Sequence, residues 1–450
     1  MSLRTVKTWG MAPVDGAPLV ALRLVFAVLV LLSTVRFAAY GWIEAQVVNP
    51  QVTFPFIAGL PRPGLIAARF LFAAMGIGAL GMLLGRPRSG ALLFFLAFTY
   101  VELLDKTNYL NHYYFVSLMA LLLVFLPTCR TDAKSVPRFA LLVPKALLTL
   151  VYFYAGVAKL HPDWMWSGMP LGLWLPQHSD MPVLGPLLAH PLAGLAFSWG
   201  GLVFDLTVGF LLWSDHWRPI VYPVVVAFHL MTWWLFPIGV FPWVMIGLTM
   251  VFFPPSVHRT WVESMTRKPL PTFMPSAVPS RANLGLGLSI AFLLVQIALP
   301  MRHLAYPGEL FWHEAGYRFS WRVMLMEKAG VAYFYARDDE GREREVDLSG
   351  SLTPNQMKMV ATQPDMLLQA ARWIRDEDRR AGGSTDAVRA EVWVSLNGRR
   401  SQLFLDPFVD LTRVDDGPWV ARDWVLPQDS IVTTAEYQRV KEDWKMRAGW

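Results

Sequence analysis

The sequence predicts a polytopic α-helical membrane bundle followed by an α+β domain outside the membrane. Of the 450 residues, 54% are hydrophobic and only 16% are charged, whereas soluble domains contain about 25% charged residues. The mean hydropathy is +0.36. Long apolar runs lie between residues 18 and 300, while the remainder is dense in Arg, Asp and Glu. We therefore expect a cytoplasmic segment 1–17, a transmembrane domain 18–300 and an extramembrane domain 301–450.

About nine apolar stretches approach the length needed to cross a bilayer, which is about 20 helical residues. Pro237 and Gly239 separate the seventh and eighth stretches, so these two spans form a tight hairpin. The predicted spans are 18–40, 64–85, 90–104, 112–128, 139–159, 194–213, 219–235, 236–253 and 284–300.

The basic residues predict the orientation of these spans. With the N-terminus inside, the outer connections before residue 301 carry only Arg62 and Lys106. The inner connections carry Arg4, Lys7, Arg86, Arg88, Arg130, Lys134, Arg138, Arg218, Arg259, Arg267, Lys268 and Arg281. This asymmetry follows the positive-inside rule and places the C-terminal domain in the periplasm or an equivalent lumen. The net charge of +6 is therefore no sign of nucleic-acid binding, because much of it flanks membrane segments.

The cysteine content and the glycosylation signals bear on the compartment. Cys129 is the single cysteine, which excludes an internal disulfide and a cysteine-based metal cluster. Acceptors of the type Asn-x-Ser/Thr are absent from the predicted outer positions. Both observations favour a bacterial inner membrane over an endoplasmic reticulum.

The extramembrane domain has the patterns of a small α+β fold. Three segments, 331–335, 391–396 and 402–405, are predicted strands, and Asn397-Gly398 is a hairpin turn signal between the last two. A helix begins at Thr353, followed by Pro354 and Gln356. A second helix, 364–379, buries Met366, Leu367, Ala370, Ala371 and Ile374 at helical spacing. We predict a β-sandwich-like unit with a helical pair.

Lys159 is the most informative single residue, because it closes a long apolar segment. The run 139–158 is interrupted only by Lys145 and Thr149. An amine at the mouth of such a helix is partly desolvated, which disfavours its charged form and makes it a candidate base. The alternative is a lysine that extends to the lipid headgroups.

Further polar residues are predicted on the same outer face. Asn111 and His112 begin the fourth span there, and His229 lies in the outer half of the seventh. A membrane-embedded base, two histidines and a soluble cap at one interface suit an enzyme that joins a lipid-soluble cofactor to a water-soluble substrate. The histidine spacings form no zinc motif, so we predict no metal.

Asp205 is predicted to lie in the middle of a span, where a charge needs a partner. Arg23 and Arg36 lie in the first span. We therefore predict that Asp205 pairs with an arginine and has a structural role.

Several motifs resemble one enzyme family. Residues 104–114 (LDKTNYLNHYY) and 152–160 (YFYAGVAKL) closely resemble two motifs of the vitamin K-dependent γ-glutamyl carboxylases. Further segments resemble the same family in the expected order: 204–210, 228–230, 236–239, 316–321, 352–354 and 364–366. The membrane part also resembles the wider horizontally transferred transmembrane domain family, whose members are not all carboxylases.

The resemblance implies a reaction and a set of partners. The family uses reduced vitamin K, O2 and CO2 to convert protein glutamates to γ-carboxyglutamates, with vitamin K epoxide as the second product. Lys159 matches the catalytic base and His112 a supporting histidine. A neutral amine can take the hydroquinone proton, and the strong base formed with oxygen survives only where water is excluded. The implied cofactor is reduced menaquinone or phylloquinone, and the implied partners are membrane lipid, quinone and a Glu-containing peptide or secreted protein.

We assign the remaining candidate residues with their alternatives. The predicted cofactor-binding residues are Asn111, His229, Tyr152 and Gly156. The alternatives are an ordinary N-cap for Asn111 and a satisfied core histidine for His229. Tyr317 and Trp321 follow the last span and line the predicted glutamate entrance, with interfacial anchoring as the alternative.

Three functions compete at this stage. The first is a γ-glutamyl carboxylase of bacterial type. The second keeps the quinone oxygenation but acts on a substrate other than peptidyl glutamate. The third is a lipid- or quinone-binding membrane module or transporter without catalysis. The chain is shorter than the animal enzymes, so we expect a reduced propeptide-binding region.

Overall fold

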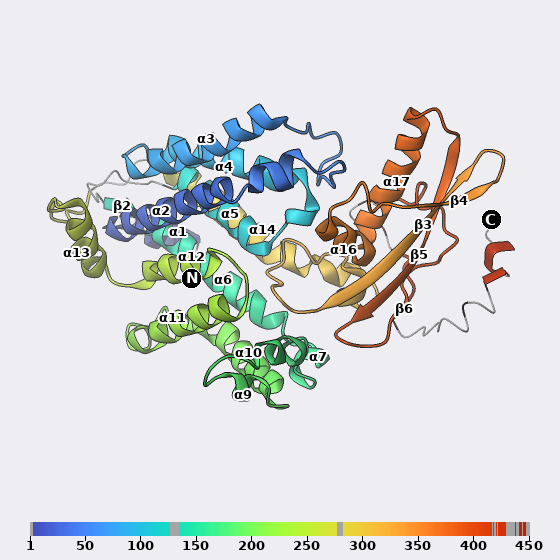
Figure 1. Cartoon of the computed structure of the whole chain (residues 1–450). Coiled ribbons are helices and arrows are strands. Elements are labelled where there is room, and N and C mark those ends of the chain that lie inside the picture. The colour runs from blue at the N-terminus through green and yellow to red at the C-terminus, as the bar shows by residue number, and fades with distance from the viewer. Residues whose placement is uncertain are drawn as a thin grey trace.

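The computed structural model describes residues 3–126, 135–276 and 282–415, and parts of 417–446. Cys129, Arg130, Lys134 and Arg281, named above, lie outside the described residues. A helical bundle forms one side of the molecule, and a sheet with two helices forms the other (Figure 1).

Each of the nine predicted spans coincides with a helix. In the part of the chain that the structure describes, six helices are long and apolar enough to cross a membrane: α2 (Ala17–Ala39), α3 (Leu65–Leu83), α4 (Pro87–Leu104), α6 (Phe139–Val157), α10 (Ala193–Leu211) and α14 (Ala282–Met301). The other three are α5 (Asn111–Phe125), α11 (Arg218–Leu235) and α12 (Phe241–Thr249). The two helices α5 and α12 are apolar but shorter. The structure thus supports an integral membrane protein with six candidate spans, and the count of nine stays a prediction.

Described elements of the predicted inner connections lie at the end of the bundle away from the sheet domain, as the labels α1 (Leu3–Gly10), β2 (Ser135–Pro137) and α13 (Pro255–Thr266) show (Figure 1). There β1 (Pro13–Asp15) pairs antiparallel with β2. Helix α13 joins them through an ion pair, in which Arg259 Nε lies 2.6 Å from Asp15 Oδ2. Helix α1 precedes β1.

Short elements make up the opposite, sheet-facing end of the bundle. Several of them fill the connection between α6 and α10, where the sequence is rich in Trp, Pro and His. These elements are η1 (Ile43–Val48), η2 (Lys106–Asn108), α7 (Pro162–Met165), α8 (Leu171–Trp174), η3 (Leu175–His178), α9 (Gly185–Leu188), η5 (Arg302–Ala305) and α15 (Leu310–His313). A further short element, η4 (Met250–Phe252), joins α12 to α13 at the other end.

Glycines allow α6 and α10 to approach closely, as small residues do in membrane helix pairs. A Cβ at Gly156 of α6 would lie 2.7 Å from the backbone nitrogen of Leu206. On α10, a Cβ at Gly209 would lie 3.1 Å from Cα of Thr149. Gly201 and Asp205 precede Gly209 at intervals of four residues, so they share its helical face. The close packing therefore presents Asp205 to α6.

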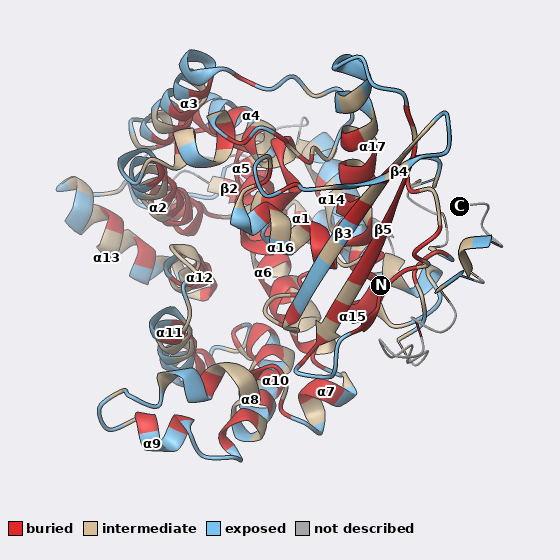
Figure 2. Cartoon of the chain, turned by 45° about the vertical axis from the view of Figure 1, so that its right-hand side comes forward, coloured by how far each residue is buried: buried red, intermediate tan, exposed pale blue. Residues whose placement is uncertain are grey.

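The C-terminal domain is one antiparallel sheet with the strand order β4-β3-β5-β6. The strands are β3 (Lys328–Asp338), β4 (Glu343–Val346), β5 (Thr385–Leu396) and β6 (Gln402–Leu403). Strand β5 is buried over most of its length, whereas much of β3 is exposed (Figure 2). The helices α16 (Pro354–Thr362) and α17 (Pro364–Arg380) pack against β3 and β5.

Several local predictions for this domain are confirmed. Thr353 and Gln356 form the capping box of α16. Asn397 and Gly398 have φ angles of 52° and 75° between β5 and β6, as the hairpin signal requires. The five apolar residues predicted to form the core of α17 are buried.

The β-sandwich-like unit is not what the described residues form. They form a single four-stranded sheet, and the core lies between this sheet and the helix pair. The reason is that the apolar side of α17 takes the place that a second sheet would fill. The α+β class itself is correct.

The outer domain is joined to the bundle by buried polar contacts. Asp365 lies 2.8 Å from Lys106 Nζ and 2.7 Å from Arg318 Nη1. Gln356 donates to the carbonyl of Val52 at 2.8 Å and to Asp105 at 3.0 Å. These contacts hold the sheet domain against the bundle.

Candidate active site

An apolar cavity of about 150 Å³ opens inside the outer half of the bundle. Its walls are largely aromatic and aliphatic, and include Phe197, Phe228 and Phe241. Five side chains in its lining bear polar groups suited to chemistry: His112, Tyr152, Lys159, Asp205 and His229. The structure therefore brings five of the predicted site residues, these four and Trp321, to one cavity together with Asp205.

Lys159 follows the last turn of α6 and is 6% exposed. Its Nζ donates to Asp205 Oδ2 at 2.7 Å and to the carbonyl of Ala155 at 3.2 Å. The ammonium group also lies 5.1 Å from the centre of the Trp164 ring, within cation–π range. The amine is thus held inside the protein, and it does not extend to the headgroups in this structure.

The predicted arginine partner of Asp205 is wrong, because Lys159 takes that place. Asp205 is 5% exposed, and removing a carboxylate from water demands a close countercharge. The arginines of span one lie on α2, whereas α10 packs mainly against α6. Neighbouring helices in space, which the sequence does not specify, decide the partner.

The two histidines have different surroundings. His229 Nε2 lies 2.9 Å from the Tyr152 hydroxyl, so these two predicted cofactor residues are hydrogen-bonded to each other. His112 stacks on Phe241 with ring centres 5.0 Å apart. Within the part of the chain that the structure describes, no residue hydrogen-bonds the His112 ring. Its nitrogens are therefore available to a ligand in the cavity.

Gly156 and Asn111 lie beside the cavity rather than in its wall. Gly156 makes the close contact between α6 and α10 described above. The Asn111 side chain accepts from the Tyr109 hydroxyl at 2.9 Å and donates to the carbonyl of Arg322 at 2.5 Å. It thereby ties the start of α5 to the loop that covers the cavity. Their predicted roles in cofactor binding stay predictions.

The segment 316–324 covers the inner cavity, which Trp321, Val323 and Met324 line. Trp321 is 1% exposed and stacks on Tyr114 with ring centres 5.1 Å apart. Phe319, Trp321 and Met324 all have positive φ angles, between 53° and 59°. Such conformations cost non-glycine residues roughly 1–3 kcal/mol each and persist only where the surroundings fix them. The Tyr109 hydroxyl does so in part, since it accepts from the Phe319 N–H at 2.7 Å.

A second cavity, of about 220 Å³, lies between the bundle and the outer domain. It shares His112, Ile238, Val323 and Met324 with the inner cavity, so the two adjoin. Tyr317 lines only this outer cavity, whereas Trp321 lines only the inner one. The two predicted entrance residues are thus placed on different sides of one loop.

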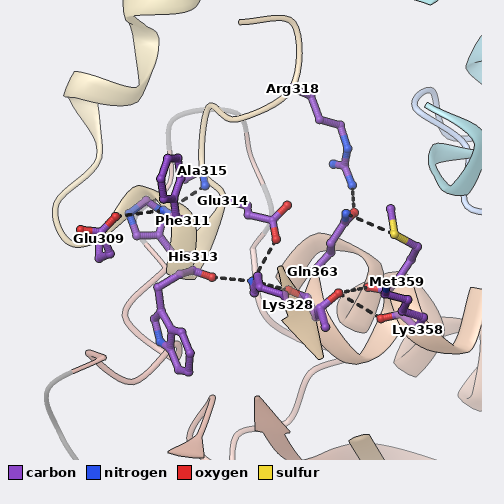
Figure 3. Close-up of polar contacts among 12 residues, drawn as sticks. Glu309, Phe311, His313, Glu314, Ala315, Arg318, Lys328, Lys358, Met359 and Gln363 are labelled. Carbon is purple, nitrogen blue, oxygen red and sulfur yellow. Dashed lines mark hydrogen bonds and ion pairs between the residues drawn. The ribbon is translucent and has the colours of Figure 1, made fainter. Parts of the chain in front are cut away.

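The outer cavity is rich in charge. Arg318 contacts Gln363, and Lys328 Nζ lies 2.9 Å from Glu314 and 2.8 Å from the carbonyl of Trp312 (Figure 3). Asp365 is shared by Lys106 and Arg318, so these three groups together keep one net positive charge. Although burial raises the pKa of Asp365, the field of those two cations outweighs it and holds the pKa well below its usual range.

Two family models match the chain in consecutive regions. The HTTM domain model matches residues 11–257, which contain the inner cavity's lysine, aspartate and histidines. The chain belongs to the HTTM domain family. The model named Vitamin K-dependent gamma-carboxylase, lumenal domain, matches residues 281–430. No solved structure matches the chain.

The two matches together make the chain a gamma-glutamyl carboxylase-type membrane protein of the HTTM family. The lumenal-domain match implies vitamin K as the cofactor. An apolar cavity with aromatic walls, an amine and free imidazole nitrogens fits a quinone ring. Among the described residues, no three His, Cys, Asp or Glu side chains gather as a metal site requires.

Sequence reasoning missed the pairing of Asp205 with Lys159 and the buried position of Arg322 in this HTTM protein. Asp205 carried a usable signal, because an intramembrane carboxylate and an intramembrane lysine in one domain are natural partners. Arg322 carried none, since arginines are common after a last span. Its surroundings, described below, exist only in the folded chain.

Proposed function

We propose that this HTTM protein is a membrane γ-glutamyl carboxylase, with reduced vitamin K, O2, CO2 and a Glu-containing peptide or secreted protein as its reactants. The observation that carries the proposal is the Lys159–Asp205 pair, at 2.7 Å, in the wall of an apolar cavity. The hydroquinone, when bound, supplies together with oxygen the strong base that removes the γ-proton of glutamate. The protein's residues then have three tasks.

The first task is to take a proton at a defined atom. Moving one proton along the 2.7 Å bond turns the ammonium–carboxylate pair into a neutral amine and a carboxylic acid. The neutral Lys159 Nζ then has a lone pair to accept a phenolic proton from the cavity. Asp205 stays protonated in this step, so the pair gains one positive charge, which balances the negative charge that the departing proton leaves in the cavity. Lys159 is thus the base and Asp205 its proton partner.

The second task is to orient the ring. His112 offers nitrogens that no described residue uses, and it stacks on Phe241 in the cavity wall. The Tyr152–His229 pair offers a second polar point, with a separation of 2.9 Å. Two polar points in an apolar wall suit the two oxygens of a quinone ring. Asn111 and Gly156 support this arrangement through the covering loop and the helix contact.

The third task is to exclude water from a strongly basic intermediate. The segment 316–324 does so by burying Trp321 against Tyr114 and placing Val323 and Met324 over the cavity. A dry site also strengthens each electrostatic contact inside it. Covering the cavity in this way requires positive φ angles in the loop, which cost conformational free energy.

The test uses purified protein in nanodiscs with reduced vitamin K, O2, labelled bicarbonate and a Glu-containing peptide. We expect vitamin K epoxide and labelled peptide together. In Lys159→Ala the rates of formation of both products should fall at least about a hundredfold, since the base is lost. Lys358→Ala, which changes an exposed lysine of α16, should form both products at the wild-type rate. Epoxide without labelled peptide would contradict the carboxylase and leave a quinone-dependent enzyme. Neither product from folded protein would favour a non-catalytic quinone-binding module.

A further inference from the structure

Arg322 is a buried cation that has no carboxylate partner among the described residues. The residue is 7% exposed, and its Nε has no hydrogen-bond partner. Within the residues that the structure describes, no carboxylate lies within ion-pair distance of its guanidinium group. Burial lowers the pKa of Arg322, but an arginine stays charged in proteins. An uncompensated buried charge is costly, so a protein keeps one where a ligand completes it.

The other charges of the outer cavity are already paired. Lys106 and Arg318 share Asp365 at 2.8 and 2.7 Å. Glu314 is held by Lys328 at 2.9 Å (Figure 3). Because Asp365 compensates only one of the two cations that it contacts, this 220 Å³ space is net positive, and Arg322 is the lining cation with no carboxylate partner among the described residues.

The backbone around Arg322 is fixed, as a binding site requires. Its carbonyl accepts a hydrogen bond from Asn111 at 2.5 Å. Trp321 before it and Met324 after it have positive φ angles of 59° and 53°. Strain of this kind is maintained at ligand sites when the surroundings fix it. The next residue, Val323, lines both cavities.

From this juxtaposition we infer that the outer cavity is a carboxylate-binding site in which Arg322 receives the side-chain carboxylate of a substrate glutamate. The inference rests on the proposed function and deepens it. Arginine binds a carboxylate through two parallel N–H···O bonds, which also orient it. The shared wall formed by His112, Ile238, Val323 and Met324 then places the γ-carbon beside the inner cavity. Arg322 thus selects Glu over Gln before any chemistry.

The test is a binding measurement that needs no turnover. Protein in nanodiscs is titrated with a Glu-rich peptide and with the same peptide in which every Glu is Gln. We expect the wild-type protein to prefer the Glu peptide. Arg322→Gln removes that preference, by roughly tenfold to a hundredfold in Kd, as the loss of a charged hydrogen bond predicts. Arg322→Lys keeps part of it, because the charge stays but the paired bonds do not.

Stability provides a second readout that separates binding from a structural role. Since no described carboxylate pairs with Arg322, we expect Arg322→Gln to unfold at the same temperature as the wild type or higher. A matched control is Arg344→Gln, which removes an exposed arginine of β4 paired with Asp378 and leaves the Glu preference intact. Lower stability in Arg322→Gln, with the wild-type Glu preference retained, would make Arg322 structural.

The outcomes distinguish the inference from the function on which it rests. Arg322-dependent Glu preference in a protein that forms no labelled peptide keeps the binding site and rejects the carboxylase. Carboxylation with equal binding of Glu and Gln peptides rejects the binding site and keeps the carboxylase. If acetate or bicarbonate alone competes as well as the Glu peptide, the assignment to a peptide side chain is overturned.

Discussion

The two adjoining cavities treat charge in opposite ways. In the inner cavity Lys159 is compensated by Asp205 at 2.7 Å, and the rest of the lining is mostly apolar. In the outer cavity Arg322 has no described countercharge, although three other cations nearby are paired. A compensated pair suits the transfer of a proton, because the site stays neutral between turnovers. A spare charge suits the capture of an anion, because the ligand completes the site.

The largest expected effect breaks the inner pair. Asp205→Ala leaves the Lys159 ammonium group buried with no carboxylate, which costs about 3–5 kcal/mol of unfolding free energy. The double variant Asp205→Leu with Lys159→Met recovers most of that loss, since two apolar side chains of similar size replace the pair. Thermal unfolding in nanodiscs measures both variants.

The double variant is also an activity control. We expect it to be stable and inactive in epoxide formation, because the proton acceptor is gone. A stable and active Asp205→Ala would show that the pair is dispensable, and the contrast between the cavities would disappear.

The next effect concerns the contact of Asp365 with Lys106 and Arg318, which holds the sheet domain to the bundle. Asp365→Asn removes the carboxylate that Lys106 and Arg318 share, at a cost of about 2–3 kcal/mol. Because the pKa of Asp365 is lowered in the folded protein, its contribution is present above its unfolded value, near 3.8, and is lost as pH falls through the folded value. Wild-type domain docking should therefore persist from neutral pH to about pH 4 and weaken below it.

The rate at which a protease cleaves the sheet domain, measured between pH 3 and 7, reports on this contact of Asp365. Asp365→Asn should be cleaved faster at pH 7 and show less additional acid sensitivity. Asp386→Asn, at an exposed ion pair with Arg413, provides the control. Parallel acid sensitivity of the wild type and Asp365→Asn would place the acid-labile contact elsewhere.

The smallest effect sharpens the geometry of the inner cavity. Gly156→Ala introduces a Cβ 2.7 Å from the nitrogen of Leu206, so α6 and α10 must separate. Overpacking of this kind costs about 1–3 kcal/mol, and it lengthens the contact between Lys159 and Asp205. We expect epoxide formation to fall about tenfold while the protein still folds. Gly200→Ala, where a Cβ meets nothing within 4 Å, should be neutral; equal activity of the two variants would reject the packing argument.

Local patterns in the sequence correctly predicted much of this fold. Turn and cap residues act within a few positions, so the capping box at Thr353 and the hairpin turn at Asn397 followed from sequence alone. Helical spacing predicted the buried face of α17 for the same reason. The sandwich prediction failed because the partner of a sheet face is a long-range choice between a helix and another sheet.

The sequence by itself determined a membrane bundle with an α+β domain, because hydropathy and periodicity are properties of short segments. It also singled out Lys159, because one charge at the end of a long apolar run is visible without a fold. The tertiary structure decided what that lysine contacts. Asp205 is 46 positions away along the chain, and only the close packing of α6 and α10 makes it the partner in place of an arginine. The same holds for Arg322: that no described carboxylate lies beside it depends on how distant segments fold around it, and its neighbours in the sequence do not show this.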